Sequence, residues 1–169
     1  MIWQGGIFLY NRQAAVDYAD KWWNSRNPAF QSFEDDCTNY ISQCLLAGGA
    51  PMHGAPNREK GWWMHKGTWS FSFTVAHSMR WYLATSTKGL TATQVKTPQE
   101  LQIGDIITYD FHGDGRFDHT TIVTAKDGDN PLVNAHTYDA YHRTWDYKDS
   151  YAYSPNAKYI FFKIHDHFS

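Results

Sequence analysis

The chain has 169 residues, of which 42% are hydrophobic and 19% are charged, and its formal net charge at pH 7 is -2. This length and composition are typical of one globular domain that buries its own core, so residues 1–169 are predicted to form a single domain. The sequence has no Lys/Arg cluster of the kind that nucleic-acid binders carry. It also has no apolar run that approaches the roughly 18 residues of a membrane span. Met1 to Tyr10 is too short for a signal peptide and lacks the basic start of one, so we expect none here.

Two helices are predicted in the first third of the chain. Asn11 is a favourable N-cap residue, and apolar residues then recur at helical spacing until Asn27-Pro28 ends the pattern. The second helix follows an acidic lead-in and begins at Cys37, with apolar partners at i+3, i+4, i+7 and i+8. Gly48-Gly49 ends it. Cys37 is therefore expected on the first turn of this helix, on the inward face.

A long loop and a third helix follow. The segment from His53 to Ser70 contains Pro, Gly and several Trp without a clear period, which predicts a long loop. This loop would be either a cleft wall or a simple connection. From Ser72 to Thr85 the apolar residues return to helical spacing, which predicts one continuous helix.

The second half of the chain has the pattern of strands. A polar hairpin loop is expected from His112 to Asp118. The predicted strands are Ile106–Asp110, His119–Ala125, Pro131–Thr137 and Ala157–His165. Helices followed by strands predict an α+β fold in which N-terminal helices pack on an antiparallel sheet.

The two cysteines have different environments in this scheme. Cys37 and Cys44 lie seven residues apart on one helix, hence about 10 Å apart at a rise of about 1.5 Å per residue. A disulfide needs less than about 7 Å, so we expect two free thiols. Backbone N–H groups at a helix start favour a negative sulfur, and only Cys37 has that position. The sequence indicates Cys37 as a nucleophile and Cys44 as a core residue.

A base for this nucleophile is sought among the nine histidines. His119 opens a strand directly after a turn loop, where its ring can reach a helix start. On the next predicted strand, Asn134 and His136 are two residues apart and share one sheet face. Either side chain could orient the His119 ring through its other nitrogen. We favour His136, with Asn134 as the alternative.

A metal site is the competing interpretation of the hairpin loop. His112, Asp114, Asp118 and His119 fall within eight positions, and His with carboxylate suits zinc. Turn chemistry around Gly113 explains the same residues more simply. We therefore predict neither a metal nor another cofactor.

Several segments, in order along the chain, resemble one family. Asp36–Gln43 followed by Gly48-Gly49 resembles the DCTNFVSQ…GG signature of the putative amidase domain of bacterial proteins. Four other segments resemble its YDR, LQxGDIIxYD, DHS and V-x-x-H-T stretches: Tyr10–Arg12, Leu101–Tyr109, Asp118–Thr120 and Val133–Thr137. That domain is similar in pattern to the NlpC-like and CHAP cell-wall peptidases, so the resemblance implies a papain-like (NlpC-like) fold.

The resemblance also implies a chemistry and a location. A triad of Cys37, His119 and His136 would cleave amide bonds in peptidoglycan peptides through a thioester, without a cofactor. The location would be extracellular or associated with the cell wall. We expect a monomer whose partner is the peptidoglycan peptide, with no nucleic-acid or membrane partner. Two rivals are a non-catalytic wall-binding module of the same fold and an acyl transferase that uses the same triad.

The start of the second helix is expected to hold the oxyanion. Backbone N–H groups around Asp36, Thr38 and Asn39, together with that of Cys37 itself, are suited to this role. The Asp36 side chain would either cap the helix or bind a substrate amine, and we favour capping.

Aromatic residues make up 17% of the chain. Three tryptophans of the long loop are candidates for stacking on a peptide or a sugar, with simple burial as the alternative: Trp62, Trp63 and Trp69.

Overall fold

A six-stranded sheet organises the chain, and every pair of neighbouring strands in it is antiparallel. The computed structural model describes residues 3–4 and 7–169, with side chains from Phe8 onward. In spatial order the strands are β5 (Ala92–Val95), β10 (Lys158–Ile164), β6 (Ile106–Asp110), β7 (His119–Asp127), β8 (Asn130–Ala135) and β9 (Ala140–Thr144). The α+β prediction is confirmed, whereas the papain-like assignment stays a prediction.

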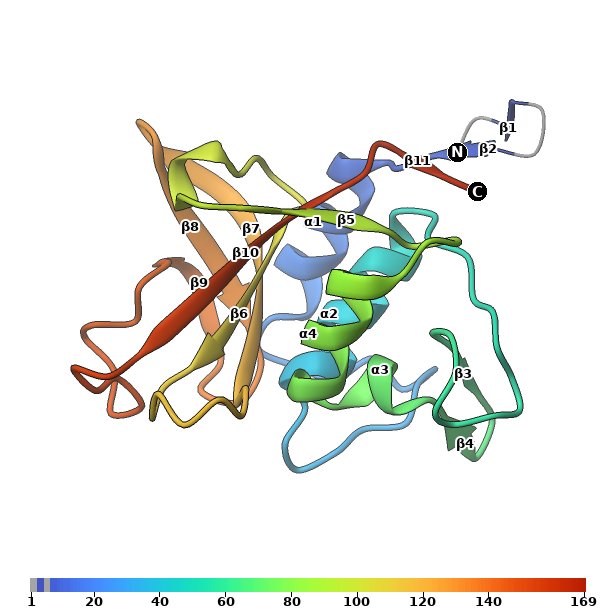
Figure 1. Cartoon of the computed structure of the whole chain (residues 1–169), viewed down its shortest axis with the longest axis horizontal. Helices are drawn as coiled ribbons and strands as arrows, with labels where there is room; N and C mark the ends of the chain where they lie inside the picture. Colours follow the sequence, from blue (N-terminus) through green and yellow to red (C-terminus); the bar gives the residue numbers. More distant parts are fainter. Residues whose placement is uncertain (1–2, 5–6) are drawn as a thin grey trace.

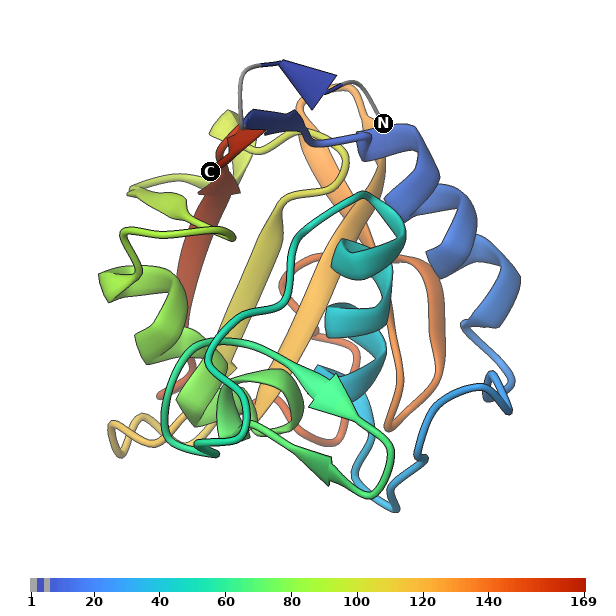
Figure 2. The same cartoon turned by 90° about the vertical axis from the view of Figure 1, so that its right-hand side faces the viewer.

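Three helices cover one face of this sheet, as the two views in Figures 1 and 2 show. They are α1 (Arg12–Trp22), α2 (Cys37–Ala47) and α4 (Ala76–Thr85), and the short α3 (Phe71–Thr74) and a 3-10 turn (Pro98–Glu100) lie between elements. Two small sheets complete the fold: β1 (Trp3–Gln4) with β2 (Ile7–Leu9) and β11 (His167–Phe168), and β3 (Met64–His65) with β4 (Thr68–Trp69). No helix in the described residues is long and apolar enough to cross a membrane.

The sheet has an apolar core on each face because successive side chains in a strand point to opposite sides. Facing the helices are Ile106, Ile122 and Phe162, which pack with buried residues of α1, α2 and α4. On the other face, Ile107, Val123 and Phe161 pack with the rings of Tyr109, Phe111 and Tyr147. Each helix-facing residue is the direct chain neighbour of one that faces away. This alternation decides which side chains can meet at the site.

Local signals fix the ends of α1 and α2. The side chain of Asn11 accepts a hydrogen bond from the Ala14 N–H at 3.0 Å, as its N-cap assignment predicts. The end expected at Asn27-Pro28 is wrong, because α1 stops at Trp22 and Asn27 instead donates to the hydroxyl of Tyr18. At the end of α2, a Cβ on Gly48 would lie 2.4 Å from the Tyr10 ring, so only glycine fits there.

The third predicted helix is divided in two. Val75 has an extended backbone (φ -120°, ψ 125°) and separates α3 from α4. A β-branched residue adopts this conformation readily, so helical spacing alone did not reveal the break. The break brings Val75 and Ala76 to the wall of a cavity. The edge strands β5 and β9 were also missed, because neither shows the regular alternation of buried and exposed residues.

Candidate active site

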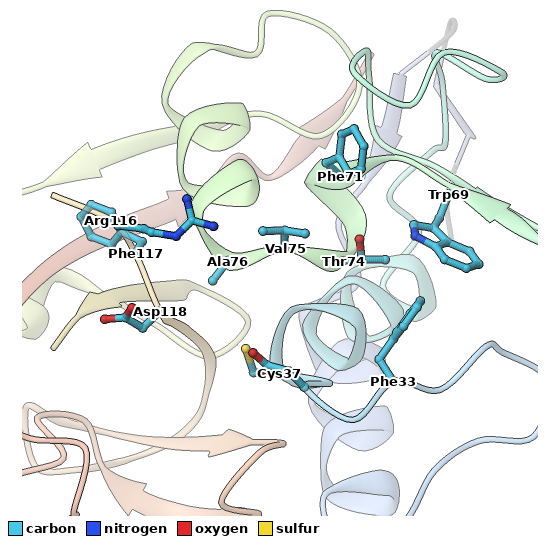
Figure 3. A pocket seen from close by; sticks show the side chains of 11 residues that line it. Phe33, Cys37, Trp69, Phe71, Thr74, Val75, Ala76, Arg116, Phe117 and Asp118 are labelled. Carbon is cyan, nitrogen blue, oxygen red and sulfur yellow. The ribbon is translucent and has the colours of Figure 1, made fainter. Parts of the chain in front are cut away.

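Cys37 lies on the first turn of α2 and lines a cavity of about 550 Å³, the Cys37 cavity. Phe33, Trp69 and Phe71 form one side of it, and Arg116, Phe117 and Asp118 form the other, with Cys37 between them (Figure 3). Cys37 is only 3% exposed, and its sulfur lies 3.6 Å from the hydroxyl of Thr38. Both cysteines are free, as expected, and Cys44 is buried in the core.

The protonation state of Cys37 differs from the expectation of a preformed thiolate. Burial, and then the nearby carboxylate of Asp35, raise the pKa of the Cys37 thiol to about 12. The hydroxyl of Thr38 and the backbone N–H of Thr120 oppose this shift only in part. At neutral pH the group is therefore a thiol. The helix start is too weak to overcome the loss of hydration.

His119 begins β7 and points into the aromatic cluster on the sheet face that lies away from the helices. Its Nε2 lies 3.0 Å from the hydroxyl of Tyr147, and its ring contacts those of Tyr109 and Phe111. Burial, and then the positive charge of Arg143, lower the pKa of His119 to about 3. The imidazole is therefore neutral at pH 7, as a general base must be.

Cys37 and His119 face adjoining spaces. His119 lines a second cavity of about 350 Å³, the His119 cavity, and Asp35 and Asp118 line both cavities. The hydroxyls of Thr38 and Thr120, each one residue along from Cys37 and His119, are 3.0 Å apart. Within the described part of the chain, no hydrogen bond joins the sulfur to the imidazole. The pairing of nucleophile and base thus stays a prediction.

The structure does not bring His136 to His119, which corrects the favoured third member of the triad. Nδ1 of His136 lies 2.7 Å from the carboxylate of Asp36, and Nε2 lies 2.6 Å from the carbonyl of Trp22. The ring also stacks on Tyr40 with centroids 3.8 Å apart. Both ring nitrogens are therefore occupied by structural partners.

Asn134, the alternative third member, is engaged elsewhere as well. Its carbonyl oxygen accepts from the Thr124 hydroxyl at 2.8 Å, and its amide donates to Asp20 at 2.9 Å. Asn134 pairs directly with Ile122, which faces the helices, whereas His119 faces the opposite side. The shared face of Asn134 and His136 was predicted correctly, but it is not the face of His119.

Asp36 holds the start of α2 in place, but not by capping it. Its side chain makes no hydrogen bond to the helix N–H groups; it accepts from the Phe33 N–H at 3.1 Å and the Asn39 amide at 3.0 Å. It is 1% exposed, so it cannot reach a substrate amine either. Both expectations for the Asp36 side chain are wrong.

The backbone N–H groups at this helix start are free. The N–H of Tyr40 is bonded to the Asp36 carbonyl, but no acceptor within the described structure satisfies those of Cys37, Thr38 and Asn39. Unsatisfied N–H groups at a helix start are donors for an anion. The N–H of Asp36 is not available, because it donates to the Thr137 hydroxyl at 3.0 Å, so the oxyanion prediction is wrong for Asp36. Thr38 and Asn39 are buried residues whose N–H groups have no acceptor in the part of the chain that the structure describes, and their oxyanion role stays a prediction.

The three loop tryptophans separate into two groups. Trp62 and Trp63 are fully buried, so the prediction that they contact a substrate is wrong. The Trp62 indole N–H donates to Ser42 at 3.0 Å within the core. Trp69 is partly exposed and lines the Cys37 cavity, which leaves it as a candidate for substrate contact.

The hairpin loop between β6 and β7 uses its carboxylates for turn formation. The Asp110 carboxylate accepts backbone N–H groups of Gly113 and Gly115, and Asp114 accepts that of Arg116. Among the described residues, no group of three or more His, Cys, Asp or Glu side chains is arranged to hold a metal ion.

Comparison with known proteins assigns a family. Residues 9–162 match the model of a family described as "Putative amidase domain". The chain belongs to this amidase family. Membership indicates hydrolysis of amide bonds, and the match extends from the strand before α1 to β10, so it includes Cys37 and His119.

Relatives of this amidase domain occur in Bacillus subtilis (strain 168). The uncharacterized protein YhbB is 61% identical over 163 residues, which are 96% of this chain and 52% of YhbB. The uncharacterized protein YjcM is 31% identical over 143 residues, which are 80% of this chain and 31% of YjcM. The chain thus spans about half or less of the relatives it matches. No solved structure matches it.

Proposed function

We propose that this amidase domain is a cysteine-dependent hydrolase with Cys37 as nucleophile and His119 as base. The observation that carries the proposal is the place of the sulfur: it is at a helix start with free N–H groups, and it lines a cavity beside that of a neutral imidazole. Family membership supplies the reaction class. Cys44 has none of these features.

The reaction starts from two neutral groups. With the substrate carbonyl in the Cys37 cavity, His119 takes the proton of the thiol as the sulfur attacks the carbonyl carbon. The negative oxygen of the tetrahedral intermediate is held by backbone N–H groups at the start of α2. The imidazolium then gives its proton to the leaving amine and the C–N bond breaks, which leaves a thioester. Neutral His119 next deprotonates a water, whose attack releases the acid and restores the thiol.

The proposed substrate is a peptidoglycan peptide. The resemblance to NlpC-like and CHAP peptidases supports this class and, with it, a location outside the cell or in its wall and a papain-like fold. The Cys37 cavity, with a volume of about 550 Å³, is within the size range of ligand pockets, and it has at least partly exposed aromatic rings on one side and Arg116 on the other. Hydrolysis by a monomer needs no further partner.

The direct test is incubation with purified peptidoglycan fragments, followed by mass analysis of the products. Wild type is expected to release shorter peptides, and Cys37→Ser is expected to release none above background. Cys44→Ala is the matched control, which removes the other thiol from the same helix and should retain activity. Equal product formation by wild type and Cys37→Ser would contradict the proposal.

A wall-binding domain without catalysis is the second candidate, because the thiol is buried and protonated. It predicts that the chain binds intact peptidoglycan without releasing any product. It also predicts equally slow alkylation of Cys37 and Cys44. A nucleophilic Cys37 is instead expected to react selectively.

A further inference from the structure

Tyr147 brings its hydroxyl to His119 from the segment that follows β9. Its Oη lies 3.0 Å from Nε2 of His119, and the two rings meet edge to face with centroids 5.1 Å apart. Tyr147 is 0% exposed, so no bulk water competes for this contact. Burial holds the pKa of Tyr147 well above its ordinary value, so the phenol is neutral at pH 7.

We infer that Tyr147 is the positioning residue of the proposed site, in the place that His136 or Asn134 was expected to take. The inference rests on the proposed function of Cys37 and His119. In this arrangement Nε2–H of His119 donates to the Tyr147 oxygen. Nδ1 then keeps its lone pair and is free to take the proton of the thiol.

The fold holds Tyr147 in a conformation that costs free energy. Its φ of 59° is in the left-handed region, which is unfavourable for a bulky residue. The guanidinium of Arg143 lies over the ring at 4.4 Å and is itself held by Asp149 at 3.0 Å. The Tyr147 carbonyl accepts the Ser150 N–H at 3.0 Å. Strain that is maintained by several contacts is typical of a functional position.

The neighbouring phenols have no such role. The hydroxyl of Tyr109 donates to the carbonyl of Trp145, and that of Tyr159 donates to the carbonyl of Asp146, each at 2.6 Å. Both hydroxyls fix the two residues that come directly before Tyr147. Tyr159 is therefore a matched control, because its hydroxyl can be removed beside the same segment without touching His119.

The first measurement is made on wild type and then repeated on two variants. NMR of ¹⁵N-labelled wild type reports which nitrogen of neutral His119 carries the proton. We expect the proton on Nε2 at pH 7, with the Nδ1–H form expected to rise in Tyr147→Phe and to stay absent in Tyr159→Phe. A proton on Nδ1 in wild type would overturn the inference, and this result does not depend on activity or on the identity of the substrate.

The second measurement follows the pH profiles of kcat and kcat/KM on peptidoglycan fragments. Tyr147→Phe is expected to lower kcat by about 100-fold and to change KM by no more than about twofold. It is also expected to shift the acidic limb of both pH profiles to lower pH. Tyr159→Phe should leave both profiles unchanged. An unchanged profile in Tyr147→Phe, while Cys37→Ser is inactive, would overturn the inference alone. Full activity of Cys37→Ser would instead overturn the proposed function.

Discussion

The charge on Asp35 affects the reactivity of the proposed nucleophile. Its carboxylate acts on the Cys37 sulfur and accepts a hydrogen bond from the Thr137 hydroxyl at 3.2 Å. Asp35 also lines both the Cys37 cavity and the His119 cavity. A negative charge near a thiol disfavours the thiolate, so Asp35 adds to the effect of burial. The site thereby keeps the thiol neutral, which is the state from which the proposed reaction starts.

Replacement of Asp35 by Asn is expected to make Cys37 more reactive. Removal of the negative charge lowers the pKa of the thiol, while an Asn carbonyl can still accept from Thr137. We expect alkylation of Cys37 by iodoacetamide at pH 8 to become about 3- to 10-fold faster. Glu34→Gln is the control, since it removes a neighbouring exposed charge that does not act on the sulfur. Equal acceleration in both variants would show a general charge effect instead.

At the scale of elements, a buried pair fixes α2 relative to α1 and β8. His136 follows β8 and joins the carboxylate that precedes Cys37 to the carbonyl of Trp22 at the end of α1. The stack on Tyr40 adds a contact on the helix itself. Loss of a hydrogen bond to a buried carboxylate is more costly than the loss of an exposed pair. His136 therefore contributes to the site through the position of the helix.

The variant His136→Ala is expected to lower the free energy of unfolding by about 1.5–3 kcal/mol, because buried Asp36 loses one charge-assisted hydrogen bond but keeps those from Phe33 and Asn39. Urea unfolding followed by fluorescence measures this change. His142→Ala is the control: His142 is partly exposed, contacts Asp20 at 3.3 Å, and should have an effect below about 1 kcal/mol. At low temperature the folded His136→Ala protein should retain activity. Normal stability with complete loss of activity would return His136 to the triad.

At the scale of the whole molecule, the local features of the site were predictable and its long-range contacts were not. Asn11 as a cap, Cys37 at a helix start and His119 at a strand start follow from neighbours in sequence. Which sheet face His119 occupies depends on strand register and is set by packing far along the chain. Nothing in the sequence around Tyr147 predicts its left-handed backbone, since such positions usually hold Gly or Asn.

Burial of His119 also links its charge to the stability of the fold. Its folded pKa of about 3 lies below the ordinary value of about 6.5, so below that pH the unfolded chain binds a proton that the folded chain does not. The contribution of His119 to the free energy of unfolding is therefore fully present above about pH 6.5 and is lost progressively as the pH falls toward 3. One pH unit corresponds to about 1.4 kcal/mol, which gives a loss of about 2 kcal/mol at pH 5.

Urea unfolding at pH 7 and pH 5 tests this linkage. Wild type is expected to lose about 2 kcal/mol more between these values than His119→Gln, which has no titrating group at this position. His165→Gln should keep the wild-type difference, because His119 is intact in it. If His119→Gln lost as much stability as wild type on acidification, the imidazole would be protonated in the folded state. The neutral base that the proposed reaction requires would then be absent at that pH.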